Sequence, residues 1–395
     1  MATAKKIQEF IGRSSWIRKM FEEGMVLAKQ YGAENVFDFS LGNPNIPPPP
    51  ELKQVIRELL DKNIPGMHDY GPNAGYPDTR EAVAAFLRQE YDVDALTADH
   101  IIMTCGAGGA LNVALKALLD PGDEVVIPVP YFVEYGFYTD NAGGVPKMVN
   151  TKEDFSLDLE AMAEAMTEKT KIVLINSPNN PTGKVYDEAT IRGLAALLEA
   201  KSAEFKKDIY LLSDEPYREI VYDNVKVPSL LKNYKNSIIG SSYSKTLSIP
   251  GERIGFLAAS PDMTDVEDVI AGLILCNRIL GYVNAPVLMQ RVVARLQGVR
   301  VNVAEYKRKR DLLCDGLAAF GYQFSRPEGA FYLFPKTPIP DDIEFVRALQ
   351  QKRILAVPGT GFGAPGYFRL AYCVADETII KALPGFEQVI KEIVS

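Results

Sequence analysis

The sequence predicts an α/β protein with a large domain, built on a mostly parallel β-sheet sandwiched by helices, and a smaller α+β domain. Short apolar runs alternate with helical patterns through the middle of the chain, which is typical of buried parallel strands and their covering helices. After Asn284 this alternation stops, and a long helical pattern with three short strand-like runs follows. The length of 395 residues is sufficient for two or three domains.

We expect a division into an N-terminal arm that packs with the small domain (1–45), a large domain (46–285) and a small domain (286–395). The arm ends at Pro44–Pro50, where four consecutive prolines make a stiff, extended connection. The large domain is expected to contain a sheet of the seven-stranded type, with these strand candidates: 101–103, 125–127, 171–175, 209–212, 237–240 and 254–258.

In the small domain, a long helix is expected over 287–320 and a last helix near 379–394. Short strands are expected at 331–334, 354–357 and 367–372. The basic residues of the long helix are expected on its solvated face: Arg291, Arg295, Arg300, Lys307, Arg308 and Arg310.

The composition excludes several classes of function. A net charge of −8 without a long basic run argues against nucleic-acid binding. Four scattered cysteines and two histidines are poor material for a disulfide framework, a zinc site or a Ser-His-Asp hydrolase. No apolar run is long enough to span a membrane, and the first residues do not form a signal peptide. We therefore expect a cytoplasmic protein with no metal, membrane or nucleic-acid partner.

The strongest motif follows the strand candidate at 237–240 and places Lys245 among hydroxyl residues, with Arg253 eight positions later. This segment resembles the pyridoxal-phosphate lysine segment of the class I and II aminotransferases, the fold-type-I family that includes aspartate aminotransferase. The resemblance extends from Ser40 to Arg369 through six motifs in the family's order. It implies pyridoxal 5′-phosphate as cofactor, with Lys245 forming an imine and Arg253 and Ser242 binding the phosphate. The chemistry requires a neutral lysine amine, although the ordinary lysine pKa is about 10.4.

Two more motifs lie at the ends of predicted strands, where α/β sheets bind ligands. In Ser213-Asp214-Glu215-Pro216-Tyr217, the resemblance implies that Asp214 pairs with the pyridine nitrogen and that Tyr217 binds the phenolic oxygen of the cofactor. In the Asn-Pro-Thr-Gly turn at 180–183, it implies that Asn180 binds the same oxygen. Each motif taken alone is also typical of an ordinary turn.

A glycine-rich loop at 104–109 opens a predicted helix, and the resemblance implies that the amides of Ala107 and Gly108 bind phosphate. A dinucleotide-binding fold is a poor alternative, because the next strand does not end in an acidic residue. The family often has a serine or threonine in this loop, whereas this sequence has none. Phe132 takes the position of the aromatic residue that stacks on the pyridine ring.

The last motif places Arg369 in an otherwise apolar strand, where a charge is costly without a carboxylate partner. The resemblance implies that Arg369 binds the α-carboxylate of the substrate, with help from the backbone near Gly42. Tyr70 matches a family tyrosine that reaches the cofactor phosphate of the neighbouring subunit. The resemblance therefore implies a homodimer with shared active sites.

The resulting hypothesis is a pyridoxal-phosphate-dependent aminotransferase that moves an amino group between an α-amino acid and a 2-oxo acid by a ping-pong mechanism. Candidate donors are aspartate or glutamate, alanine and aromatic amino acids, with 2-oxoglutarate as acceptor. Arg278 is a candidate for binding a distal carboxylate, and Trp16, Tyr131 and Tyr282 are candidates for lining the side-chain pocket. A lyase on the same fold, catalysing β-elimination or decarboxylation, stays an alternative. A cofactor sensor tied to gene regulation would need a DNA-binding module, for which the chain has little room.

Overall fold

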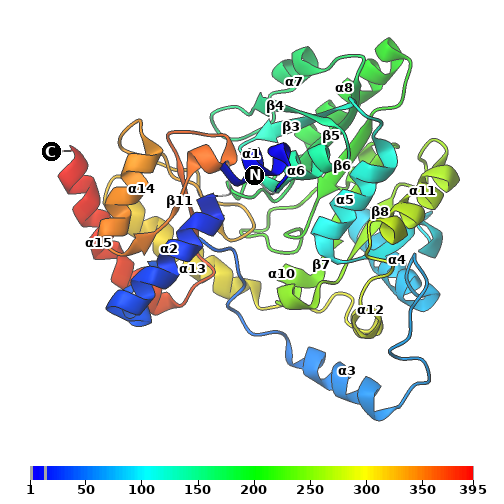
Figure 1. Cartoon of the computed structure of the whole chain (residues 1–395), viewed down its shortest axis with the longest axis horizontal. Helices are drawn as coiled ribbons and strands as arrows, with labels where there is room; N and C mark the ends of the chain where they lie inside the picture. Colours follow the sequence, from blue (N-terminus) through cyan, green and yellow to red (C-terminus); the bar gives the residue numbers. More distant parts are fainter. Residues whose placement is uncertain (1–2, 13–15, 395) are drawn as a thin grey trace.

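The central sheet forms where the buried apolar runs of the sequence pair side by side (Figure 1). In this computed structural model, which describes residues 3–12 and 16–394, the sheet has seven strands. Only β8 runs antiparallel to its neighbours, so the predicted mostly parallel sheet is confirmed. The strands lie in the order β2 (Ile101–Thr104), β8 (Gly255–Ala259), β7 (Ser237–Ser242), β6 (Tyr210–Asp214), β5 (Thr170–Asn176), β3 (Glu124–Val129) and β4 (Val145–Asn150).

Helices cover both faces of this sheet, because alternate residues of each strand point to opposite sides. Ile172 and Leu174 of β5 pack in one core, whereas Val173 and Ile175 pack in the other. The first face is covered by α5 (Gly106–Leu118), α6 (Glu134–Asn141) and α11 (Val266–Ile279). The second face is covered by α7 (Leu159–Ala165), α8 (Glu188–Phe205) and α9 (Leu230–Asn233), and near β2 and β8 by α3 (Pro50–Asp61), α4 (Pro77–Tyr91) and α12 (Val287–Ala294).

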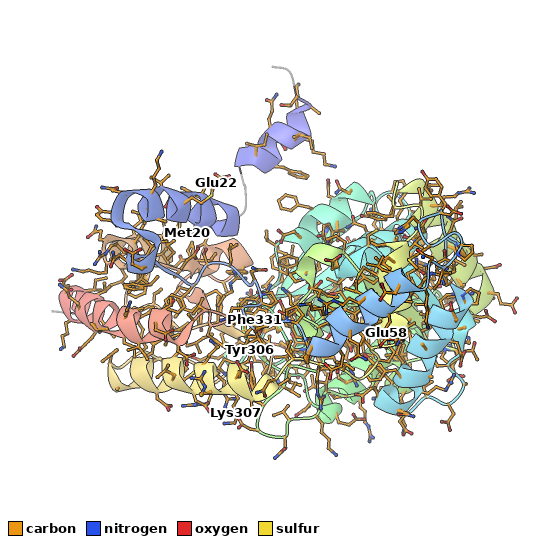
Figure 2. All side chains as sticks on the ribbon, turned by 90° about the horizontal axis from the view of Figure 1, so that it is seen from below. Met20, Glu22, Glu58, Tyr306, Lys307 and Phe331 are labelled. Carbon is orange, nitrogen blue, oxygen red and sulfur yellow. The ribbon has the colours of Figure 1, made fainter. Side chains whose placement is uncertain are left out.

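A second core lies beside the large sheet and contains most of the C-terminal part of the chain (Figures 1 and 2). Its helices are α2 (Trp16–Tyr31), α13 (Val303–Ala319), α14 (Asp342–Gln351) and α15 (Asp376–Val394). They surround two small sheets, one made of β11 (Val357–Pro358), β12 (Phe368–Ala371) and β9 (Tyr332–Leu333), and the other of β1 (Phe37–Asp38) and β10 (Ile354–Leu355). The predicted combination of a large α/β region and a smaller α+β region is confirmed.

The N-terminal segment contacts both regions. Met20 of α2 lies in the second core, and β1 pairs in parallel with β10. By contrast, α1 (Lys5–Gly12) leans on α6, where Lys6 pairs with Asp140 at 2.6 Å and the rings of Phe10 and Phe137 are 4.9 Å apart. The remaining short helices are η1 (Ala33–Asn35), η2 (Ala98–His100), α10 (Tyr243–Thr246), η3 (Pro250–Glu252) and η4 (Gly359–Phe362).

The prediction of one long helix over 287–320 is wrong. The segment forms α12 and α13, separated at Gly298, whose φ of +77° is in the left-handed region. Asn302 then caps α13 by accepting a hydrogen bond from the backbone N–H of Ala304. Met289 and Val292 of α12 pack in the core shared with α3 and α4. We therefore propose a boundary between the two domains nearer 300 than 286.

Candidate active site

A cavity of about 300 Å³ lies at the carboxyl ends of β5, β6 and β7. This is the edge at which parallel α/β sheets bind ligands. Eleven of the sequence-predicted site residues line it, although these residues come from distant parts of the chain. They are Gly42, Ala107, Gly108, Phe132, Asn180, Asp214, Tyr217, Ser242, Lys245, Arg253 and Arg369.

Lys245 lies in the single turn of α10, directly after β7. Its Nζ donates a hydrogen bond to the carbonyl oxygen of Gly42 at 2.8 Å. Burial lowers the pKa of Lys245 to about 8, and the positive charges of Arg369 and Arg253 act in the same direction. A much larger share of this amine is therefore neutral near pH 7 than of an ordinary lysine.

Asp214, the last residue of β6, has one satisfied and one unsatisfied carboxylate oxygen. Its Oδ2 accepts a hydrogen bond from the hydroxyl of Tyr135 at 2.6 Å. Its Oδ1 is buried and has no hydrogen-bond partner among the described residues. Burial raises the pKa of Asp214 to about 7, while the bond from Tyr135 acts against this shift. A buried, unpartnered carboxylate oxygen is ready to accept a proton or an N–H donor.

The two tyrosines Tyr217 and Tyr332 are joined by a hydrogen bond of 2.8 Å between their hydroxyls. Gly42 is packed directly against this pair. A Cβ atom at Gly42 would lie 1.9 Å from the Tyr332 hydroxyl oxygen, so no larger residue fits there without a shift. The backbone at Gly42 thus approaches the cavity closely enough to accept the hydrogen bond from Lys245.

Arg369 is a buried cation without a carboxylate partner. Only 1% of its surface is exposed, and among the described residues it forms no salt bridge. Its Nη1 donates to the Asn180 side-chain oxygen at 3.0 Å and its Nη2 to the Ser40 carbonyl oxygen, while its Nε has no described partner. The guanidinium lies over the rings of Tyr332 and Phe362, 4.6 and 4.8 Å from their centroids. Such a group is expected to bind an anionic ligand.

A second candidate anion site lies at the start of α5. In contrast to the site at Arg369, it is formed largely by backbone N–H groups. Gly106 has a φ of +72°, and a Cβ atom there would lie 3.0 Å from Nη2 of Arg253. The absence of a side chain thus lets the guanidinium approach the first turn of the helix. Ser242 precedes α10 and lines the same cavity. Free N–H groups, a helix N-terminus, an arginine and a hydroxyl together suit a phosphate group.

Five further polar residues line the cavity, and the sequence analysis did not assign them to the site. Tyr135 binds Asp214, and Tyr332 binds Tyr217. Asn176 donates to the Asp214 carbonyl oxygen at 2.8 Å and accepts from the Asn180 N–H at 2.7 Å, which joins two of the predicted motifs. The other two residues, Tyr138 and Ser244, also line the cavity.

Several expected residues lie outside the cavity. Tyr70 is 89% exposed, and Arg278 is exposed in the last turn of α11. Trp16 packs against a small aromatic core, and Tyr131 and Tyr282 pack against the core under α5, so none of the three lines the cavity.

The described residues, 3–12 and 16–394, contain no cluster of side chains that could hold a metal ion. None of their helices combines the length and apolarity that a membrane span requires.

The chain is similar to known proteins over most of its length. The family model of the class I and II aminotransferases matches residues 34–384. A probable aspartate aminotransferase of Methanocaldococcus jannaschii is 36% identical, covering 90% of this chain and 92% of that protein. An amino transferase of Eubacterium rectale is 40% identical with a TM-score of 0.96, covering 99% of both chains. The aspartate aminotransferase of Thermus thermophilus with maleate is 31% identical with a TM-score of 0.88, covering 98% of this chain and 100% of that one.

The chain therefore belongs to the class I and II aminotransferase family. It is an aminotransferase of the fold-type-I architecture, and the family resemblance inferred from the sequence is confirmed.

Proposed function

We propose that this aminotransferase binds pyridoxal 5′-phosphate at Lys245 and transfers an amino group from an α-amino acid to a 2-oxo acid in a ping-pong cycle. The observation that carries this proposal is the unpaired Arg369, which shares one cavity with the lysine of lowered pKa. A buried guanidinium without a carboxylate supports binding of the α-carboxylate, and a neutral amine supports reaction with an aldehyde.

The residues of the cavity fit this cofactor. The free Oδ1 of Asp214 suits the N–H of a protonated pyridine ring. Ser242, Arg253 and the first turn of α5 suit its phosphate, and Phe132 offers a ring for stacking. When bound, the cofactor supplies an aldehyde carbon that exchanges amines and a ring that accepts electrons from the substrate Cα.

The chain's own residues then have separate tasks. Arg369 and Asn180 hold the α-carboxylate, with the Gly42 backbone beside it, and so fix the orientation of the Cα–H bond. Lys245 takes the proton from Cα and returns it, because its lowered pKa lets the amine serve as base and its conjugate acid as donor near neutral pH. Asp214 keeps the proton on the ring nitrogen, and Tyr217 donates to the phenolic oxygen.

For the substrate, we propose a dicarboxylic donor such as aspartate, with aromatic amino acids as second candidates. The support is that relatives are named aspartate aminotransferase in Pyrococcus abyssi and aromatic-amino-acid aminotransferase 2 in Thermococcus litoralis. Both are 32% identical over 96% of this chain. In this proposal a distal carboxylate would be bound by Arg278 only from a neighbouring subunit, because Arg278 does not line the cavity of its own chain.

The proposal includes a homodimer in which Tyr70 reaches the phosphate of the neighbouring cofactor. An aromatic side chain that is 89% exposed supports a role in such a contact. We also propose that the enzyme works in the cytoplasm. All four cysteines are free thiols, which suits a reducing compartment.

The test is reduction of the protein with borohydride after incubation with pyridoxal phosphate, followed by peptide mapping. We expect the label on Lys245 and no label in Lys245→Ala. In a separate sample that has not been reduced, incubation with aspartate alone should give stable pyridoxamine phosphate and oxaloacetate. Release of ammonia or carbon dioxide in place of these products would favour the lyase alternative, although the relatives reported above are all named as aminotransferases.

A further inference from the structure

The start of α5 lacks a hydroxyl for binding phosphate. Its first four residues, from Gly106 to Gly109, are glycine and alanine. Thr104 precedes them, but it is fully buried and its hydroxyl donates to the Gly106 carbonyl oxygen at 3.0 Å. The loop itself therefore offers only backbone N–H groups to a ligand.

Tyr138 of α6 brings a hydroxyl to this place from another element. Its side chain lines the cavity together with Gly108, Ser242 and Arg253. A Cβ atom on Gly108 would lie 3.3 Å from the Tyr138 hydroxyl oxygen, so this oxygen stands beside the position that a residue-108 side chain would occupy. The hydroxyl thus takes the place of one that a serine at 108 could provide.

The Tyr138 hydroxyl is also free to bind a ligand. The other tyrosine hydroxyls of the cavity have partners, since Tyr135 donates to Asp214 and Tyr217 is bonded to Tyr332. The Tyr138 hydroxyl forms no hydrogen bond to another described residue, and it is open to the cavity. An accessible, unpartnered donor in a cavity with an arginine is available to an anion.

The protonation state of Tyr138 suits a donor. Burial raises the pKa of Tyr138, with Glu134 and Asp214 adding to the shift, and the charge of Arg253 acts against it. The phenol therefore stays protonated at neutral pH and can donate a hydrogen bond. Tyr282 is a weaker candidate, because its ring approaches Gly109 with carbon atoms and it does not line the cavity.

We propose that Tyr138 donates a hydrogen bond to the phosphate monoester of the cofactor and replaces the hydroxyl that the loop lacks. This proposal rests on the proposed function, because it assumes a phosphorylated pyridoxal in the cavity. It assigns Tyr138 to the phosphate end of the site, away from the reacting carbon.

The experiment compares two aldehydes that differ only in the phosphate. Dissociation constants of pyridoxal phosphate and of pyridoxal are measured by absorbance titration of cofactor-free protein, for the unchanged chain and for Tyr138→Phe. A hydrogen bond to a charged group predicts that Tyr138→Phe binds pyridoxal phosphate about 10–100-fold more weakly. Pyridoxal, which has no phosphate, should bind both proteins equally.

Two further variants separate this role from altered packing. Gly108→Ser in the Tyr138→Phe background offers a serine hydroxyl in the space that the phenol oxygen vacates, and we expect it to recover at least part of the lost affinity. Tyr135→Phe is the matched control, since this tyrosine lies one turn earlier on α6 and binds Asp214. We expect it to weaken both aldehydes by the same factor, because it acts through the ring nitrogen.

An unchanged affinity in Tyr138→Phe, or an equal loss for both aldehydes, would overturn the assignment of Tyr138. Neither result would contradict the proposed function, provided that borohydride reduction still links pyridoxal phosphate covalently to Lys245 in the unchanged chain. If that label does not form, both proposals fail together.

Discussion

Two arginines are almost completely buried among the residues that the structure describes, and their surroundings differ in one respect. Arg369 in the cavity is 1% exposed and lies 4.6 Å from the ring centroid of Tyr332. Arg310 on α13 is 2% exposed and lies 4.7 Å from the ring centroid of Tyr222. Both therefore lose their hydration and gain a similar contact with an aromatic ring.

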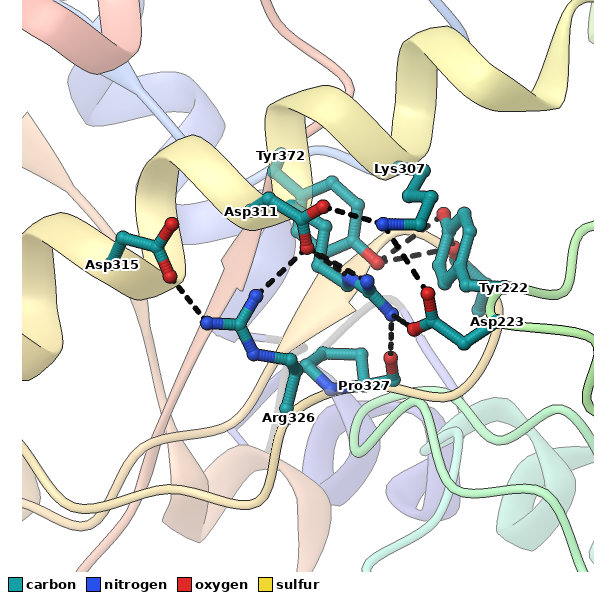
Figure 3. A network of polar contacts seen from close by, with 10 residues as sticks. Tyr222, Asp223, Lys307, Asp311, Asp315, Arg326, Pro327 and Tyr372 are labelled. Atoms are coloured by element: carbon teal, nitrogen blue, oxygen red, sulfur yellow. Dashed lines mark hydrogen bonds and ion pairs between the residues drawn. The ribbon is translucent and has the colours of Figure 1, made fainter.

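The difference lies in the charged partners. Arg310 pairs with Asp223 and Asp311, each at 2.7 Å, and donates to the Pro327 carbonyl oxygen at 2.9 Å. Figure 3 shows Asp223, Asp311 and Pro327 within one network that also includes Lys307 and Arg326. Among the described residues, the hydrogen-bond partners of Arg369 are neutral oxygens. A buried charge that the chain compensates is structural, whereas one that it leaves uncompensated is available to a ligand.

One segment links the two arginines. Pro327 accepts the hydrogen bond from Arg310, and the next two N–H groups, of Glu328 and Gly329, donate to the Gly183 carbonyl oxygen at 2.9 and 3.0 Å. Gly183 closes the turn that carries Asn180, the partner of Arg369. The compensated arginine thus holds a segment that packs against the turn supporting the uncompensated one.

The largest effect is expected when the uncompensated arginine is removed. Arg369→Met should lower kcat/KM for α-amino acids by about 10²–10⁴-fold, because the α-carboxylate loses a buried ionic partner. The free energy of unfolding should not fall, since no carboxylate is left unpaired. Steady-state kinetics and urea unfolding measure the two quantities. Arg369→Lys keeps the charge without the two-pronged geometry and should fall between the two proteins; unchanged kinetics in Arg369→Met would contradict the comparison.

Lys245 extends the comparison, because it is another cation of the cavity and, among the described residues, its hydrogen-bond partner is also a neutral oxygen. Its pKa is about 8 in the folded chain, against about 10.4 when unfolded, so the unfolded state binds more protons between these values. The stability of the cofactor-free protein should therefore rise with pH over this window. Lys245→Met lacks this cost and should be more stable below pH 8 by at most about 3 kcal/mol.

This advantage should shrink through pH 9 and disappear above about pH 10.5, where the wild-type amine is neutral in both states. Urea unfolding of both proteins at a series of pH values measures the difference. An advantage that stays constant with pH would show that charge burial is not its cause.

Removal of the compensated arginine should give the opposite pattern. Arg310→Met leaves Asp223 and Asp311 without their main partner, and we expect a loss of about 1–3 kcal/mol in the free energy of unfolding. Kinetic constants should change less than those of Arg369→Met. Arg308→Met is the matched control, since Arg308 lies on the same helix but is 56% exposed beside Asp376, and its loss should cost less stability than the loss of Arg310. Equal losses in the two variants would refute the structural role of Arg310.

The sequence predicted the parts of the fold that are made of buried apolar runs. It did not predict β4, an edge strand in which three of the six residues are exposed and which contains Pro146, so no apolar run marks it. It placed Arg310 on a solvated face, and this prediction is wrong. The helical pattern predicts solvent exposure for a charged residue such as Arg310. The pattern does not show that Asp223 and Tyr222, which are far away in the sequence, cover this side chain.

Most of the predicted site residues lie in motifs that follow strands, and Arg369 is the one charged residue of an apolar strand, so a local pattern is enough to find them. Tyr135 and Tyr138 lie on a helix, and Tyr332 lies within an apolar strand. Their residue types are those of ordinary core residues, and only the packing of three distant segments shows that they reach the cavity. The separate roles expected of the individual motifs are predictions, and the variants described above test them.

The smallest effect is expected when one of the two carboxylates beside Arg310 is removed. This change tests whether Asp223 and Asp311 both balance the charge of Arg310. Asp223→Asn removes one of two carboxylates, but Asp311 remains within 2.7 Å of Arg310 and Lys307 keeps its bond to Asp311. The Asp223 side chain is 50% exposed, so solvent screens the pair and the expected loss is about 0.2–1 kcal/mol at pH 7.

The pH dependence of this loss gives a second test. Arg310 lowers the pKa of Asp223, so the ion pair stabilises the protein above the ordinary aspartate pKa and its contribution is lost as the pH falls through the lowered value. The difference between wild type and Asp223→Asn should therefore shrink as the pH falls below the ordinary aspartate pKa of about 3.9, as urea unfolding from about pH 7 down to about pH 2 would show. A difference of the same size in acid would mean that Asp223 acts by packing, and the contrast between the two arginines would then rest on Asp311 alone.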